Sequence, residues 1–177
     1  VHVAARLRVL RPVRRGQDEG AVVGEHAREL GQHPRLVARL QVLDRLVDEE
    51  LFTESEWASV DAVAGIESRG FILAAALAER RHKGFVAIRK KGKLPPPVVD
   101  VSYDLEYGSG VLEMQTGSGG LLLIDDVLAT GGTLGASVAL SRQAGYSLVG
   151  IGVLLDIGIA PGFRCGDFVP RSVLQYG

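Results

Sequence analysis

The chain has 177 residues, which is enough for one domain with a substantial core. Hydrophobic residues make up 46% and charged residues 23%, an ordinary balance for a globular protein in water. The formal net charge of −1 gives no general attraction to nucleic acid or to membrane surfaces, so we expect neither as a partner.

The first 50 residues have a restricted composition. They contain only ten residue types (Val, His, Ala, Arg, Leu, Pro, Gly, Gln, Asp and Glu), and these are the ten types whose codons begin with G or C. One hypothesis is translation from the wrong frame or strand of a GC-rich gene. The alternative is a natural segment of biased composition, since residues 37–51 have helical spacing of apolar residues. Val1 to Arg15 lacks the apolar stretch of a signal peptide and the chain has a single cysteine, so we expect a cytoplasmic protein.

From residue 51 onward the chain alternates between short apolar runs and helical patterns. This alternation predicts an α/β fold with a mainly parallel sheet between helices, in which ligands bind at the carboxyl ends of the strands. We therefore treat residues 51–177 as the core of a single domain. The predicted elements are strands at Val63–Ile66, Phe85–Ile88, Leu121–Ile124 and Val149–Leu155, and helices at Phe71–Lys83 and Leu134–Ala144.

Two of the predicted strands are followed by loops that carry positive charge. The first strand leads into Glu67–Gly70, which contains Ser68 and Arg69. The second leads into the segment 89–95, which contains Arg89 and Lys93. Each loop alone would be read as a solvated basic turn. Because the two loops follow successive strands, we instead predict a shared site for a multiply negative ligand.

The third strand leads into the most informative run of the sequence. Two acids, Asp125 and Asp126, follow it directly. A loop of small residues and the next helix come after them (Ala129, Thr130, Gly131, Gly132 and Thr133). Glycine amides, threonine hydroxyls and a helix N-terminus together form a phosphate cradle. The acids then suit sugar hydroxyls or a divalent cation. Helix capping and chain turning would explain single parts of this run, but not all of them in one contiguous stretch.

This run resembles the phosphoribosyl pyrophosphate signature of the type I phosphoribosyltransferases. Three further segments resemble the adenine branch of that family, namely 64–71, 89–95 and 102–108, and residues 172–176 resemble its closing strand. The resemblance covers Asp61 to Tyr176. It implies a central, mainly parallel, twisted sheet flanked by helices, with a flexible catalytic loop. It also implies a purine-salvage enzyme, a glycosyltransferase that converts adenine and phosphoribosyl pyrophosphate to AMP and pyrophosphate, and a homodimer.

By the same resemblance, roles can be assigned to individual residues. Thr130 to Thr133 would hold the 5-phosphate, and Ala129 is also counted as substrate-binding. Asp125 and Asp126 would contact the ribose hydroxyls or Mg²⁺, directly or through water. Ser68, Arg69, Arg89 and Lys93 would bind pyrophosphate, with Arg69 also counted as catalytic. Glu106 would hydrogen-bond the purine and handle its proton, and Tyr107 would help to close the loop over the site. The glycines between Gly108 and Gly120 predict a flexible lid.

One part of the family pattern is absent. The base of these enzymes is held by an N-terminal hood with a Phe-Pro-x-x-Gly-type segment, whereas no phenylalanine precedes Phe52 here. Residues 1–50 occupy the hood position without its motif. Xanthine or another purine is therefore an alternative base. A non-catalytic regulator that senses phosphoribosyl pyrophosphate is the alternative from another functional class.

Overall fold

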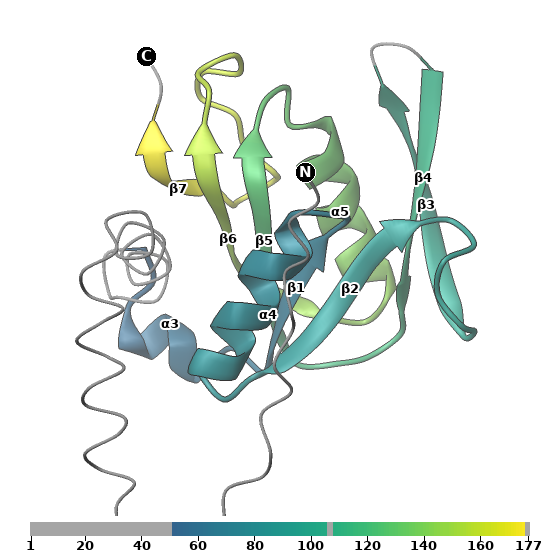
Figure 1. The fold of residues 1–177 in the computed structure, drawn as a ribbon, viewed down its shortest axis with the longest axis horizontal. Helices are drawn as coiled ribbons and strands as arrows, with labels where there is room; N and C mark the ends of the chain where they lie inside the picture. The colour runs from purple at the N-terminus through teal and green to yellow at the C-terminus, as the bar shows by residue number, and fades with distance from the viewer. Residues whose placement is uncertain (1–50, 106–107, 176–177) are drawn as a thin grey trace, which may run out of the picture. The chain divides into compact units, whose positions relative to one another are not determined.

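The computed structural model describes residues 51–105 and 108–175 (Figure 1). The predictions for residues 1–50, Glu106, Tyr107 and Tyr176 lie outside the described residues. The elements, in chain order, are α3 (Glu54–Ala58), β1 (Ala62–Ile66), α4 (Gly70–Arg80), β2 (Gly84–Lys90), β3 (Val98–Leu105), β4 (Gly108–Gln115), β5 (Gly120–Leu128), α5 (Gly132–Gln143), β6 (Ser147–Asp156) and β7 (Arg171–Gln175).

The strands form one seven-stranded sheet in the order β3-β4-β2-β1-β5-β6-β7. Strands β1, β2, β5, β6 and β7 run parallel, and the β3–β4 hairpin joins β2 in the antiparallel direction. The mainly parallel sheet predicted from the sequence is confirmed. Strand β1 lies in the centre, and the carboxyl ends of the parallel strands meet at one edge, the upper edge in Figure 1.

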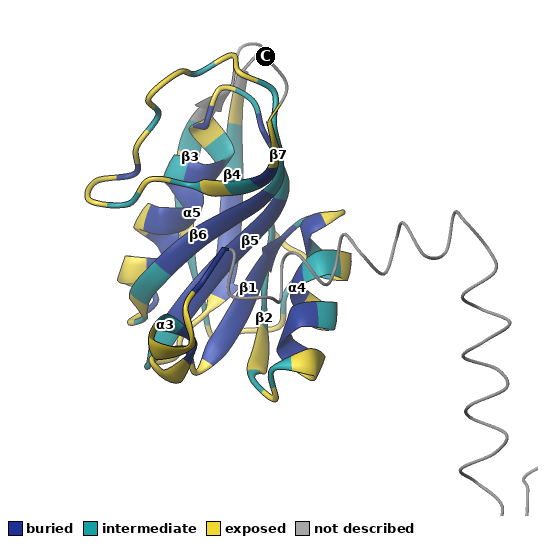
Figure 2. Ribbon diagram, turned by 90° about the vertical axis from the view of Figure 1, so that its left-hand side faces the viewer, coloured by how far each residue is buried: buried dark blue, intermediate teal, exposed yellow. Residues whose placement is uncertain are grey.

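Each face of the sheet has its own hydrophobic core. Leu121 and Leu123 of β5 pack on the α5 side, whereas Leu122 and Ile124 pack on the side of α3 and α4. All four are completely buried, as expected for a strand covered on both faces. Figure 2 shows the central strands as a buried layer between α4 and α5. Among the described residues, no helix combines the length and apolar character needed to cross a membrane.

Most of the segment from Gly108 to Gly120, for which the sequence predicts a flexible lid, is a β-strand, and its flexibility stays a prediction. Residues 108–115 form β4, which pairs with β3 along its whole length. Leu112 and Met114 are buried, so alternate side chains of the strand enter the core. The glycine at position 110 has a packing reason, because a Cβ atom there would lie 2.7 Å from the Tyr103 ring of the neighbouring strand. Glycine at position 110 therefore allows the close approach of the Tyr103 ring.

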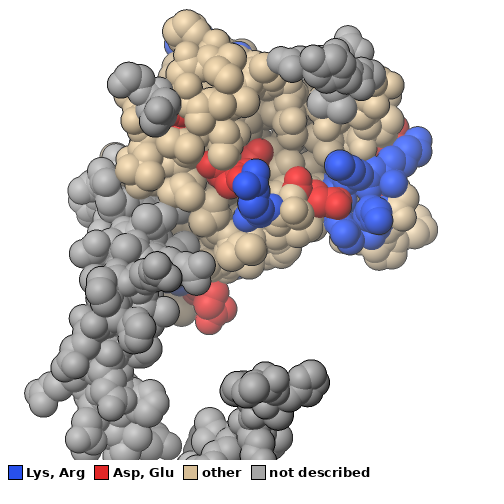
Figure 3. All heavy atoms as spheres, turned by 45° about the horizontal axis from the view of Figure 1, so that its top comes forward, with Lys and Arg blue, Asp and Glu red and all other residues tan. Residues whose placement is uncertain are grey.

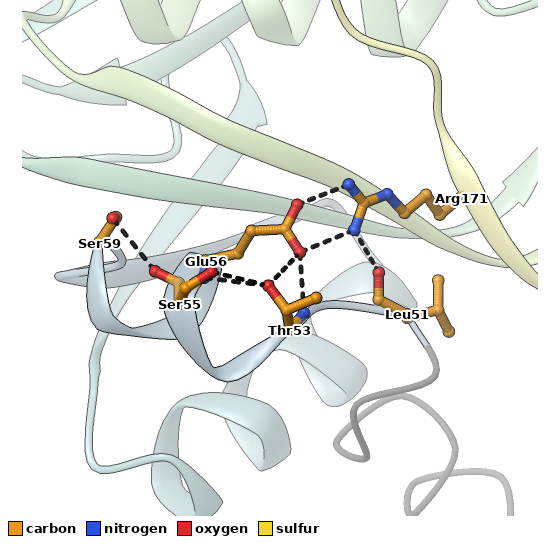
Figure 4. Close-up of polar contacts among 6 residues, drawn as sticks. All are labelled: Leu51, Thr53, Ser55, Glu56, Ser59 and Arg171. Carbon is orange, nitrogen blue, oxygen red and sulfur yellow. Dashed lines mark hydrogen bonds and ion pairs between the residues drawn. The ribbon is translucent and has the colours of Figure 1, made fainter.

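A polar clamp joins the short helix α3 to the last strand (Figure 4). Thr53 and Glu56 form a capping box, in which the Thr53 N–H donates to Glu56 Oε2 at 2.8 Å. Arg171 of β7 donates to both carboxylate oxygens of Glu56, at 2.5 and 3.0 Å, and to the carbonyl oxygen of Leu51. The guanidinium also lies over the Phe52 ring, 4.9 Å from its centre. The clamp therefore holds segments that are far apart in sequence.

We expect the clamp to make stability depend on pH at the acid end. The hydrogen bond from Arg171 is the main reason why the pKa of Glu56 falls from 4.5 to about 2. A lowered carboxyl pKa in the folded state stabilises the protein fully above the ordinary value, and this contribution is lost as the pH falls toward 2. Because both side chains are partly exposed, we expect Glu56→Gln to lower the free energy of unfolding by only about 1 kcal/mol at pH 7.

Urea unfolding of wild type and Glu56→Gln between pH 7 and pH 2 would measure this difference. The gap should shrink steadily below pH 4.5. The matched control is Glu79→Gln, which removes the same charge from an exposed position on α4. A gap of the same size at pH 7 and pH 2 would contradict the assignment.

Candidate active site

The loop after β1 brings a cation to the carboxyl edge of the sheet. Arg69 is the N-cap residue of α4, and its Nε lies 2.7 Å from Oδ2 of Asp126 at the end of β5. The Arg69 side chain is 77% exposed, whereas that of Asp126 is 20% exposed, so water screens the arginine and Arg69 can exchange Asp126 for a ligand. Ser68, the preceding residue, is also exposed. Two residues singled out in different segments of the sequence are therefore in contact.

The two acids occupy different environments within the last part of β5. Asp125 is only 9% exposed, and a Cβ atom on Gly70 would lie 3.0 Å from its Oδ1, so the start of α4 packs closely on this carboxyl group. Burial, helped by the neighbouring charge of Asp126, raises the pKa of Asp125 to about 7. Oδ1 of Asp125 accepts the N–H of Asp126 at 2.9 Å. A cation in front of Asp125 would favour its ionised form.

The segment after β5 has the geometry of an anion site. Together with the end of β5 and the first turn of α5, it lines a cavity of about 80 Å³ (Asp125, Val127, Ala129, Thr130, Gly131, Gly132, Thr133 and Leu134). Gly131 has φ = 84°, a left-handed conformation that glycine adopts without strain. Among the described residues, no side chain caps the N-terminus of α5, so its first N–H groups remain available for a ligand.

The end of β2 and the segment after it place a basic cluster beside these loops. Nε of Arg89 lies 3.4 Å from Oε2 of Glu67, and Nη1 of Arg89 donates to the carbonyl oxygen of Lys93 at 3.1 Å. Glu67 also accepts the N–H of Lys90 at 3.0 Å, so it links the first and second loops. Figure 3 looks toward the carboxyl edge and shows acidic and basic side chains near its centre, with a larger basic cluster to one side.

The structure thus brings most of the predicted site residues to one edge. Arg69 contacts Asp126, residues 129–133 form a cavity with Asp125, and Arg89 contacts Lys93. The predictions for Glu106 and Tyr107 lie outside the described residues. Sequence reasoning gave no role to Glu67 or to Glu113, which bind the backbone of the basic segment. The sequence pattern that could have identified Glu113 is a single acid between two apolar residues of a strand.

The donor set suits a magnesium ion that is shared with a phosphorylated ligand. Within the described parts of the chain, no group of three or more acidic, histidine or cysteine side chains could enclose a metal ion. Mg²⁺ commonly takes one or two carboxylates from the protein and fills its remaining positions with phosphate oxygens and water. Asp125, which lines the anion cavity, and the adjacent Asp126 fit that requirement.

Comparison with known proteins gives the family. The family model described as phosphoribosyl transferase domain matches residues 27–163, which include the second half of the segment of restricted composition. The adenine phosphoribosyltransferase of Hydrogenovibrio crunogenus is 46% identical over 127 residues, which cover 71% of this chain and 74% of the relative. The chain belongs to the adenine phosphoribosyltransferase family.

Solved structures of this family share the fold. The adenine phosphoribosyltransferase of Rhodothermus marinus superposes with a TM-score of 0.66 at 39% identity, covering 82% of each chain. The enzyme of Giardia lamblia in complex with 9-deazaadenine gives a TM-score of 0.67 at 32% identity, covering 85% of this chain and 84% of that one. These matches confirm that the chain has the type I phosphoribosyltransferase fold implied by the sequence resemblance.

Proposed function

We propose that the chain catalyses the transfer of a 5-phosphoribosyl group from phosphoribosyl pyrophosphate to adenine, giving AMP and pyrophosphate. This is the reaction of a glycosyltransferase in purine salvage. The observation that carries the proposal is the arrangement at the end of β5, where Asp125 lines an anion cavity and the adjacent Asp126 contacts Arg69. A sugar that carries one phosphate and one pyrophosphate group matches this arrangement: the phosphate suits the anion cavity, the sugar hydroxyls suit the acids, and the pyrophosphate suits Arg69. The relatives named above, which are adenine phosphoribosyltransferases, support adenine as the base.

We assign the two ends of phosphoribosyl pyrophosphate to different loops. The 5-phosphate would lie in the cavity of residues 129–133, where α5 begins and its N–H groups favour an anion. The ribose hydroxyls would face Asp125 and Asp126. Pyrophosphate would take hydrogen bonds from Ser68, Arg69, Arg89 and Lys93, so that Arg69 would leave Asp126 when the ligand arrives. The ionic contacts of the ligand-free site are thereby exchanged for contacts with the substrate.

In the chemical step, a ring nitrogen of adenine forms a bond to C1 of the ribose while the bond from C1 to the pyrophosphate oxygen breaks. The bonding electrons leave with pyrophosphate, whose growing negative charge is stabilised by the cations of the first two loops. The ring nitrogen loses its proton, and we assign the acceptor role to Glu106. Tyr107 would help to exclude water, which would otherwise hydrolyse the activated sugar.

Three further properties belong to the same proposal. Mg²⁺ would be held by Asp125 and Asp126 together with substrate oxygens, and when bound it supplies charge neutralisation at the leaving group. A homodimer is supported by exposed apolar side chains on two neighbouring elements: Ile72 of α4 is 72% exposed and Phe85 of β2 is 44% exposed. The single cysteine is compatible with a reducing compartment, and we propose the cytoplasm.

An assay of the full chain with phosphoribosyl pyrophosphate, Mg²⁺ and one base at a time tests the proposal. We expect AMP to form from adenine, and kcat/KM for adenine to exceed that for xanthine and hypoxanthine by about a hundredfold or more. Preference for xanthine would replace the base but keep the reaction class. Binding of phosphoribosyl pyrophosphate without turnover of any base would favour a sensing regulator, and absence of binding would overturn the proposal.

A further inference from the structure

Glu113 is a buried carboxylate that none of the roles above uses. It lies on β4, directly between Arg89 of β2 and Asp100 of β3 in the sheet register, and it is only 3% exposed. An acid at such a position is retained in ionised form only if hydrogen bonds replace its lost water. The hydrogen-bond partners of Glu113 therefore indicate its role.

All three partners are consecutive N–H groups of the basic segment after β2. Gly92 donates to Oε2 of Glu113 at 2.9 Å, and Lys93 and Leu94 donate to Oε1 at 2.6 and 2.7 Å. The hydrogen bond from Gly92, followed by those from Leu94 and Lys93, holds the pKa of Glu113 below its ordinary value in spite of burial. Gly92 has φ = 83°, which helps the chain to turn its amides toward one point.

This arrangement decides how the segment meets a ligand. Three amides in a row could cradle a phosphate group, but here they point inward at a protein carboxylate. The carbonyl oxygen of Lys93 is held as well, by Arg89, and that of Pro95 accepts from the side chain of Gln115 at 3.3 Å. The main chain around Lys93 is thus fixed from several sides, whereas Lys93 itself is exposed.

We propose that Glu113 is a positioning residue for pyrophosphate recognition: it fixes the main chain of residues 92–94 so that the ammonium group of Lys93 is directed at the leaving group. This inference rests on the proposed function, in which Lys93 binds pyrophosphate. Glu113 acts through Lys93 and does not touch the substrate. Because the main chain at Lys93 is already fixed, less conformational entropy is lost when its flexible side chain binds the ligand.

Glu113→Gln tests this role with almost no change in size. The glutamine amide group would set its own N–H donors against the backbone donors of the segment, so the loop would lose its fixed position. We expect the Kd of pyrophosphate and of phosphoribosyl pyrophosphate, each with Mg²⁺ and measured by calorimetry, to rise about tenfold. The Kd of AMP should stay the same, because AMP has no pyrophosphate group. Hydrogen exchange at the amides of residues 92–94 should become faster.

Two comparisons separate positioning from a general loss of structure. Asp100→Asn removes a carboxylate from the adjacent strand, where Asp100 pairs with Lys91 at 2.9 Å, and should leave all three affinities unchanged. In a Lys93→Ala background, Glu113→Gln should weaken pyrophosphate binding no further, because both changes act through one side chain. Equal weakening of AMP and pyrophosphate, unchanged pyrophosphate binding, or additive effects of the two substitutions would overturn the proposal. A wild-type chain that binds none of the three ligands would instead contradict the proposed function.

Discussion

Replacing Asp125 and Asp126 together by asparagine is expected to lower kcat/KM for AMP formation about a thousandfold. The negative charges of Asp125 at the anion cavity and of Asp126 beside Arg69 would be lost, and with them the ligands proposed for the ribose hydroxyls and for Mg²⁺. The fold should persist because asparagine has the same shape and its side-chain oxygen can still accept the N–H of residue 126. Burial already disfavours the charge on Asp125, whose pKa is raised to about 7, so thermal stability should be unchanged or slightly higher.

Steady-state kinetics and thermal unfolding of the same preparations would check both halves of this expectation. Asp167→Asn is the matched control, since Asp167 is an exposed acid outside the site. Wild-type kinetics in the double variant would show that the acids have no role with the sugar or the metal. A large fall in melting temperature would show that they serve the fold instead.

Gly131→Ala is expected to damage both the phosphate loop and the stability of the protein. The residue has φ = 84°, which an alanine adopts only with strain, and the new Cβ atom would lie 2.1 Å from Cε2 of Phe163. We expect the free energy of unfolding to fall by about 2–4 kcal/mol from strain and overpacking together. The Kd of phosphoribosyl pyrophosphate should rise by about a hundredfold, because the first N–H groups of α5 would be displaced from the cavity.

The chain contains its own control for this substitution. Gly135 lies in the same helix with nothing within 4 Å of an added Cβ atom, so Gly135→Ala should stabilise the protein by about 0.5–1 kcal/mol and leave ligand binding unchanged. Removing the aromatic ring in a Gly131→Ala/Phe163→Ala variant should recover the part of the affinity that is lost to the collision. If the alanine variants at 131 and 135 behaved alike, the proposed geometry of the phosphate loop would be wrong.

The sequence predicts well those elements in which the local pattern of apolar residues corresponds to the side chains that are buried. The continuous apolar run Leu121–Ile124 identifies a strand covered on both faces, and the structure extends it to Leu128, so both acids lie within β5 rather than after it. The β3–β4 hairpin was missed. Its glycines suggested a mobile segment, although Val99, Val101 and Tyr103 on the partner strand alternate with polar residues and pack against the core.

For the site, residue types could be predicted but partners could not. The sequence places Arg69 and Asp126 after different strands, and only the sheet order brings them into contact. Glu113 is the clearer case, because its role depends on how a loop some twenty residues earlier folds back onto β4. No short pattern in the chain contains that information. Contacts between segments distant in sequence are decided by topology, and a lone acid within a strand gives no indication of its partners.

The central position of β1 has a consequence for the order in which the protein is assembled. Its neighbours are β2, which follows soon in the chain, and β5, which becomes available only after the whole hairpin has been synthesised, since Ala62 pairs with Leu121. A nascent chain that ends before β5 therefore leaves the middle of the sheet with an open edge and exposed apolar surface. Addition of β5 closes that edge and delivers Asp125 and Asp126 beside Arg69 in the same event. Closure of the central edge of the sheet and formation of the contact between Arg69 and Asp126 thus depend on the same strand.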